Sequence, residues 1–217
     1  MVDMALRQRE DSQVAAKLRS AGIQASSVFD LVNSGKTEPT AIPILVSSLP
    51  EVTDLWIKQG IVRALTVPEA RGIANKPLLA QFLQPSIHDA TGGAASLKWA
   101  IGNALAIIAT DLDYPTLVDI LRDPRHGKSR EMVALALATA RVPDAAPVLC
   151  ESLSDSEIAG HCLMALNKIR AVCSLGQLEE LESDKRGWVR REARQMRKRI
   201  EQGHKPRAMS STPKDGG

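Results

Sequence analysis

The sequence predicts an all-α protein in which pairs of helices repeat along the chain. Three observations support this fold class. A proline followed by two leucines recurs, an Ala-Leu pair recurs between the prolines, and no segment shows the alternating, β-branched pattern of a strand. The recurring prolines lie 34, 38 and 32 residues apart, which is the repeat length of helical solenoids. We therefore expect a stack of about five to six helix pairs.

The first helix of each unit begins near a proline, with leucines two and six residues later. Proline suits the first helical turn because its φ is already set and its missing N–H needs no partner there. Leucines four residues apart share one helix face, so we expect them to pack between units. The sets are Pro43 with Leu45 and Leu49, Pro77 with Leu79 and Leu83, Pro115 with Leu117 and Leu121, and Pro147 with Leu149 and Leu153.

The second helix of each unit carries the Ala-Leu pair, and its small alanines allow close helix packing. The pairs are Ala64-Leu65, Ala104-Leu105, Ala136-Leu137 and Ala165-Leu166, and a last copy has Met196-Arg197 in the same position. The front half of that last unit is degenerate, with Gly176 in place of the proline. We expect residues 1–39 to form a divergent first unit.

The repeated pattern resembles a known family. Pro147 to Ile169 reads PVLCESLSDSEIAGHCLMALNKI, and the pattern Pro-x-Leu-x3-Leu-x-Asp, a turn, then apolar-Arg-x5-Ala-Leu is similar to the short bacterial HEAT repeats first described in phycobilisome lyases. The resemblance covers roughly residues 40 to 200. It implies a right-handed α-α superhelix, a HEAT-like and armadillo-like solenoid over residues 1–202. It also implies a protein-binding scaffold, since the repeat defines an architecture rather than a reaction.

The same resemblance implies a ladder of acidic and basic side chains between repeats. The acidic positions hold Glu51, Pro85, Asp123, Asp155 and Asp184, and the basic positions hold Lys58, Lys98, Arg130, Ala159 and Arg190. We therefore expect the ladder to be interrupted at Pro85 and Ala159, which carry no charge.

Positive charge is concentrated in residues 185–199, which sum to +7, whereas residues 1–184 sum to −5. A helix this basic can bind nucleic acid or an acidic protein surface. The candidate polyanion-binding residues are Arg190, Arg191, Arg194, Arg197 and Lys198. The alternative is a polar terminal cap, because Arg197 stands where inner repeats place leucine. We favour the cap, and both roles are compatible.

Two long joins form a candidate binding edge. Residues 84–96 (QPSIHDATGGAAS) contain Gly92-Gly93, which predicts a flexible segment, and residues 122–130 (RDPRHGKSR) are basic. Both joins are expected on one edge of the stack, where loops on a rigid scaffold often bind partners. Drift in a tolerant surface loop is the alternative for each join. The candidate partner-binding residues are Lys98, Trp99, Arg125, His126 and Arg130.

The cysteines and the chain ends predict a cytoplasmic protein. Three cysteines, without paired spacing, argue against a disulfide framework, and Cys150, Cys162 and Cys173 are expected to pack as small apolar groups on helices. No segment is long and apolar enough to predict a membrane span or a leader peptide. Residues 203–217 lack apolar periodicity and are expected to form a disordered tail.

No catalytic, metal or cofactor site is predicted. The four histidines lack the spacing of metal ligands, and no phosphate-binding Gly-Lys-Ser/Thr motif occurs. We expect a non-catalytic protein-interaction scaffold or adaptor. The alternative is a nucleic-acid-binding HEAT-like protein, with a repair enzyme similar to the alkylpurine DNA glycosylases as one form of it. No Trp/Asp/Arg set aligns with that family's pattern, and the net negative charge of residues 1–184 opposes contact with phosphates.

Overall fold

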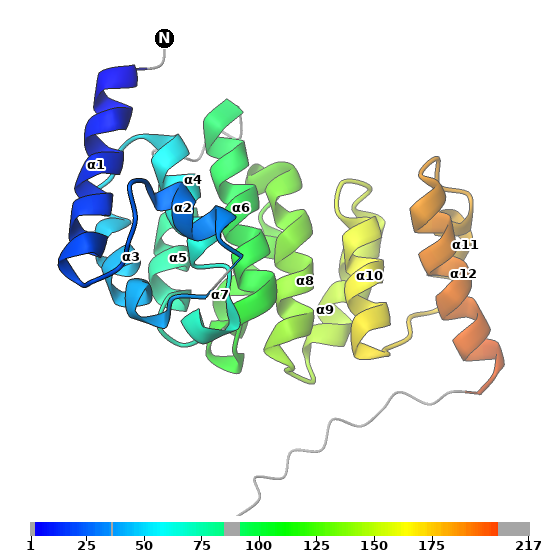
Figure 1. The fold of residues 1–217 in the computed structure, drawn as a ribbon. Helices are drawn as coiled ribbons and strands as arrows, with labels where there is room; N and C mark the ends of the chain where they lie inside the picture. Colours follow the sequence, from blue (N-terminus) through cyan, green and yellow to red (C-terminus); the bar gives the residue numbers. More distant parts are fainter. Residues whose placement is uncertain (1–2, 36, 85–91, 204–217) are drawn as a thin grey trace, which may run out of the picture.

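The computed structural model describes residues 3–35, 37–84 and 92–203, and every regular element in those ranges is helical (Figure 1). The all-α prediction is therefore confirmed for the described part of the chain. Its α-helices are α1 (Met4–Ser20), α2 (Val28–Asn33), α3 (Ile42–Ser48), α4 (Leu55–Ala64), α5 (Asn75–Phe82), α6 (Gly92–Ile108), α7 (Tyr114–Arg122), α8 (Arg130–Ala140), α9 (Ala145–Glu151), α10 (Ala159–Ile169), α11 (Leu175–Glu182) and α12 (Gly187–Glu201). Residues 1–39, which we expected to form a divergent first unit, contain α1 and α2.

The helices pack in two layers that run in chain order. In one layer, α2 packs on α4, α4 on α6, α6 on α8, α8 on α10 and α10 on α12. In the other layer, α3, α5, α7, α9 and α11 each pack on the even-numbered helix that follows. Figure 1 shows the even-numbered helices side by side, with α1 and α12 at opposite ends of the row. Each even-numbered helix therefore has one side that the layer of odd-numbered helices does not cover.

The predicted leucine positions form the contact between the layers in most units. Leu117 and Leu121 of α7, and Leu149 and Leu153 of the α9 unit, are all buried, as predicted. Pro115 is the second residue of α7, so its ring sits where no intrahelical N–H is needed. The recurring proline thus marks a helix start, and the leucines behind it mark the buried face.

The α5 unit departs from this register. Leu79 is buried as predicted, but Leu83, which follows the last residue of α5, is 44% exposed, and Leu78 and Phe82 are the fully buried residues of this helix. Phe82 offers more apolar area than Leu83, and a one-residue shift rotates a helix by about 100°. Burial of the larger side chain therefore decides which face of α5 turns inward.

One prediction about the joins needs correction. Gly92 and Gly93 begin α6, so this part of residues 84–96 is helical and not a flexible join. The rest of the join, residues 85–91, lies outside the described residues, as does the predicted tail apart from Gly203.

The cysteine prediction was wrong for two of the three residues. A disulfide joins Cys150 of α9 to Cys173, which follows α10, with Cα atoms 5.7 Å apart. Only Cys162 packs as a buried apolar group, and burial raises the pKa of its thiol to about 12. The disulfide removes the cysteine-based argument for a reducing compartment. Within the described ranges, none of the helices combines the length and the apolar character that crossing a bilayer requires.

Glycines let the even-numbered helices approach one another closely. A Cβ on Gly102 of α6 would lie 2.7 Å from the Cβ of Met132 on α8. A Cβ on Gly160 of α10 would lie 2.3 Å from the ring of Trp188 on α12. Both distances are far below van der Waals contact, so an alanine at either position would force the neighbouring helix or side chain to shift.

Candidate functional site

The predicted binding edge is largely interior. Lys98 and His126 are buried, and Lys98 Nζ lies 3.0 Å from His126 Nδ1 and 5.1 Å from the ring centre of Phe82. His126 Nε2 is 3.7 Å from Asp123 Oδ2. Burial lowers the pKa of Lys98, and the charge of Asp123 partly opposes this effect. This cluster fastens the 122–130 join onto α6, so Lys98 and His126 are unavailable to a partner.

Arg130 is also buried, and it links two successive units. Its guanidinium lies 2.7 Å from Asp155 and 3.2 Å from Glu157, and it donates to the carbonyl of Leu121. A buried guanidinium is tolerated when carboxylates and carbonyls satisfy its charge and its donors. Arg130 is therefore a structural residue, and our assignment of Lys98, His126 and Arg130 as partner contacts is corrected by their burial.

Within the described residues, the expected ladder is complete at Arg130 and Asp155 alone. Lys58 donates to Gln81 at 2.6 Å rather than to an acidic residue. Because Ala159 carries no charge, Asp184 is bound instead by Arg186, at 2.8 Å. That contact lowers the pKa of Asp184 to about 2. Hydrogen-bonding residues outside the predicted ladder positions therefore replace the missing ladder contacts.

Trp99 and Arg125 remain as exposed members of the predicted set. Trp99 is 49% exposed on α6. Arg125 is exposed but folds back onto Asp123 at 2.7 Å, and this contact holds the pKa of Asp123 well below its usual range. Trp99 is consequently the stronger candidate for a contact with another molecule.

The uncovered side of the even-numbered helices, which we call the second-helix face, presents equivalent positions from successive units. Two positions are defined relative to the alanine of each Ala-Leu pair, or to Met196 in the last unit. The first lies one residue before it and the second lies three residues after it, and at both positions the side chain is at least partly exposed. The first position holds Arg63, Asn103, Leu135, Met164 and Gln195, and the second holds Val67, Ile107, Thr139, Lys168 and Arg199. Sequence reasoning overlooked this set, although apolar residues at Ile107, Leu135 and Met164 are unusual for a solvated helix face and were a usable signal.

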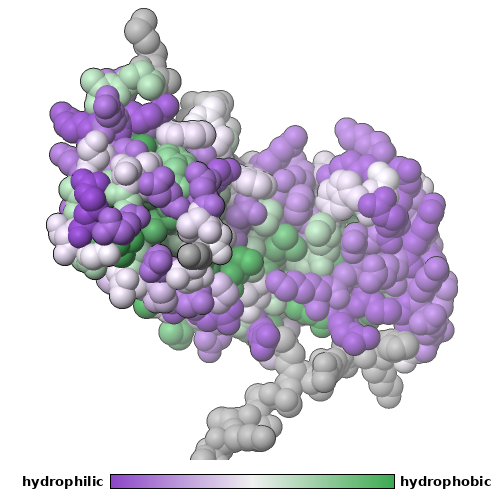
Figure 2. Space-filling view, viewed as in Figure 1, coloured by the Kyte–Doolittle hydropathy of each residue, from purple (hydrophilic) through white to green (hydrophobic). Residues whose placement is uncertain are grey.

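These positions form an apolar groove across α6, α8 and α10. The groove has a volume of about 410 Å³ and is lined by Thr66, Asn103, Ala106, Ile107, Met132, Leu135, Met164 and Lys168. Figure 2 shows apolar surface gathered in the middle of this face, with hydrophilic surface over the α11 and α12 end. Ile107 is 42% exposed, so a large apolar side chain faces solvent at this groove.

A second groove lies beside it and contains Trp99. This tryptophan groove also has a volume of about 410 Å³, and it is lined by Gln59, Arg63, Ala95, Ser96, Trp99, Ala100, Lys128 and Ser129. It brings the start of α6 beside the 122–130 join, so the predicted adjacency of the two joins holds for their described parts.

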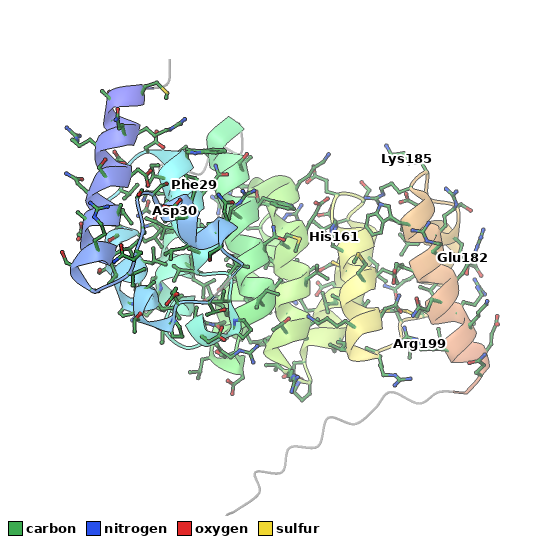
Figure 3. All side chains as sticks on the ribbon, in the orientation of Figure 1. Phe29, Asp30, His161, Glu182, Lys185 and Arg199 are labelled. Atoms are coloured by element: carbon green, nitrogen blue, oxygen red, sulfur yellow. A yellow bond between two sulfur atoms is a disulfide. The ribbon has the colours of Figure 1, made fainter. Side chains whose placement is uncertain are left out.

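The basic helix α12 divides into engaged and exposed cations. Arg190 donates to the carbonyls of Asp184 and Lys185, and Arg197 pairs with Glu182 at 2.5 Å. Arg199 donates to Asn167 of α10, and Figure 3 shows it near the end of α12. The exposed members of the predicted polyanion-binding set are Arg191, Arg194 and Lys198, which line a groove of about 450 Å³.

The charges on the second-helix face are unequally satisfied. Glu157 lies 3.2 Å from Arg130, whereas Glu131 lies 3.8 Å from His161 Nδ1, which makes no hydrogen bond within the described residues. Burial lowers the pKa of His161 and so favours its neutral form. Among the described residues, several cations of this face have no acidic side chain within 4.0 Å. They include Arg63, Lys128, Lys168, Arg191, Arg194, Lys198 and Arg199. The face therefore combines an apolar centre with uncompensated positive charge.

Comparison of the chain with protein-family models, with curated proteins and with solved structures found no match.

Proposed function

We propose that this protein is a HEAT-like solenoid, a right-handed superhelix of helix pairs, that acts as a non-catalytic scaffold or adaptor for another protein. The repeated Pro-Leu and Ala-Leu positions support the repeat family. The sequential packing of α2, α4, α6, α8, α10 and α12 supports the solenoid, since each unit contacts mainly its neighbours. The link from Arg130 to Asp155 supports the inter-repeat ladder.

The single observation that carries the binding role is the apolar surface left open on the second-helix face. Trp99 and Ile107 are roughly half exposed there, beside the apolar groove. Covering apolar surface releases about 25 cal/mol per Å², and tryptophan is enriched among the residues that dominate protein interfaces. A contiguous apolar patch with a charged border is the usual appearance of a protein-binding surface.

A photo-crosslinking residue on this face tests the role. It is placed at Asn103, and in a matched control at Asp119, which lies on α7 in the other layer. We expect a protein crosslinked at position 103 and absent at 119. Once purified, that protein should bind the Trp99→Ala variant at least about tenfold more weakly than wild type. Undiminished affinity for Trp99→Ala and for Ile107→Ala would refute this face as the binding site.

Nucleic-acid binding is the second candidate function, and the exposed row Arg191, Arg194 and Lys198 favours it. An activity similar to the alkylpurine DNA glycosylases belongs to this alternative. Each phosphate contact contributes a slope of about −0.9 to the log–log dependence of duplex-DNA affinity on salt. Gel shifts at low salt should then weaken in a variant with Arg191→Glu and Arg194→Glu. An absence of binding at micromolar protein leaves α12 as the polar cap of the stack.

A further inference from the structure

Apolar and basic side chains occupy different parts of the second-helix face. Ile107, Leu135 and Met164 come from three successive helices and form the apolar groove. Lys168 closes the groove on the α10 side, and Arg63 lines the tryptophan groove on the other side of α6. An occupant that fits must therefore bring apolar side chains to the middle and negative charge to both sides.

The geometry points to an acidic amphipathic helix of a partner protein as the occupant of the apolar groove, with its carboxylates beside Lys168 and Arg63. This inference rests on the proposed scaffold function and states the chemistry of the partner. The partner helix would lie across α6, α8 and α10 with its apolar stripe on Ile107, Leu135 and Met164.

A helix fits this groove better than an extended peptide. An extended peptide is bound either by pairing with a sheet edge or by seating prolines in an aromatic-lined groove. The described residues contain no strand, and the apolar groove is lined by no aromatic side chain. A helix satisfies its backbone N–H and C=O groups internally and presents apolar residues at every third or fourth position. Neighbouring helices lie about 8–10 Å apart, so three of them span about 20 Å, the length of a helix of about 13 residues.

The charge of the face specifies acidic residues. Arg63 has no acidic partner among the described residues, and Lys168 donates only to the hydroxyl of Thr139, at 2.8 Å. Burial, and then the charge of Arg141, lower the pKa of Lys168. A carboxylate arriving beside Lys168 would offset both effects, because an opposite charge favours the charged form.

The apolar centre separates this occupant from nucleic acid. Phosphate backbones are bound by dense cationic and polar contacts, and aliphatic side chains contribute little to them. Leu135 and Met164 lie where a duplex would need cations. The dense cationic row on α12 lines another groove of the second-helix face, and none of its residues lines the apolar groove.

Fluorescence anisotropy with a defined probe tests the inference. The probe is a labelled helical peptide of about 18 residues, with leucine at the i, i+3, i+4 and i+7 positions and glutamate on its flanks. Its twin has lysine in place of every glutamate. We expect the glutamate peptide to bind and the lysine peptide not to bind, and the affinity of the glutamate peptide to fall as salt screens the ion pairs.

Charge reversals on the protein locate the site. Lys168→Glu and Arg63→Glu should each lower the affinity for the glutamate peptide by about tenfold. Met164→Glu should abolish its binding, and the two surface reversals keep the test valid if that variant fails to fold. Lys76→Glu makes the same charge change on α5, in the other layer, and should alter the affinity by less than about twofold.

Several results would overturn the inference. Equal binding of both peptides would show that the site lacks charge preference, and displacement of the glutamate peptide by duplex DNA would assign the groove to nucleic acid. A concentration-dependent dimer that Met164→Glu dissolves would make a second copy of this chain the occupant. If the crosslinked partner requires Trp99 while the glutamate peptide does not bind, the scaffold function stands and this inference alone fails.

Discussion

Truncation of Leu149 to alanine tests the repeat architecture directly. Leu149 has no exposed surface and lies in α9, which packs on α8 and α10. The change removes three carbon groups, and at about 0.8 kcal/mol for each the lost transfer free energy is about 2.4 kcal/mol. The cavity left between helices raises the expected loss in the free energy of unfolding to about 3–4 kcal/mol. For a chain of this length the melting temperature should fall by roughly 10 °C.

The assay is urea denaturation and thermal melting followed by far-UV circular dichroism. The matched control is Leu112→Ala, because Leu112 is 86% exposed in the turn before α7. The control should change the free energy of unfolding by less than about 0.5 kcal/mol. Equal denaturation midpoints for the two variants would refute the assignment of the Pro-Leu positions to the contact between helix layers.

Three further predictions concern packing, redox state and pH. Gly102→Ala should destabilise the protein by about 1 kcal/mol, because overpacking against α8 exceeds the gain in helix propensity. Gly176→Ala should stabilise it by up to about 1 kcal/mol, because a Cβ at position 176 has nothing within 4 Å. Urea denaturation should show these opposite signs, and a stabilised Gly102→Ala variant would contradict the packing argument. Reduction of the disulfide, or Cys150→Ser, should lower the free energy of unfolding by about 3 kcal/mol, and thiol titration of the unreduced, denatured chain should find one thiol rather than three. The pKa of Asp184 in the folded protein is lowered to about 2, so its contribution to stability is present above its unfolded pKa and is lost as pH falls from about 4 to 2. In the Arg186→Met variant, NMR titration should show the pKa of Asp184 returning toward its ordinary value. An unchanged pKa would disprove the contact.

The helical layers could be predicted from local sequence because their signals are local. Pro115 suits the first turn of a helix because its φ is already set, and Leu117 and Leu121 share a face by helix geometry alone. The α5 unit shows where this reasoning ends. Leu83 fits the same spacing but is exposed, because competition with Phe82 for the interior depends on the area that α6 offers. The disulfide between Cys150 and Cys173 likewise follows from the packing of α9 beside the segment after α10, which spacing along the chain does not report.

The sequence by itself determined an all-α chain of repeated helix pairs, with its positive charge gathered in one terminal helix. Only the tertiary structure decided which charged side chains are available to a partner. Lys98, His126 and Arg130 are as polar in sequence as Lys168, yet the fold buries them against Phe82 and Asp155. The physical reason is that burial depends on the neighbouring helices. A cation on a helix faces either a carboxylate in the interior or open solvent, depending on which helix packs beside it, and the spacing of residues along the chain does not predict that neighbour.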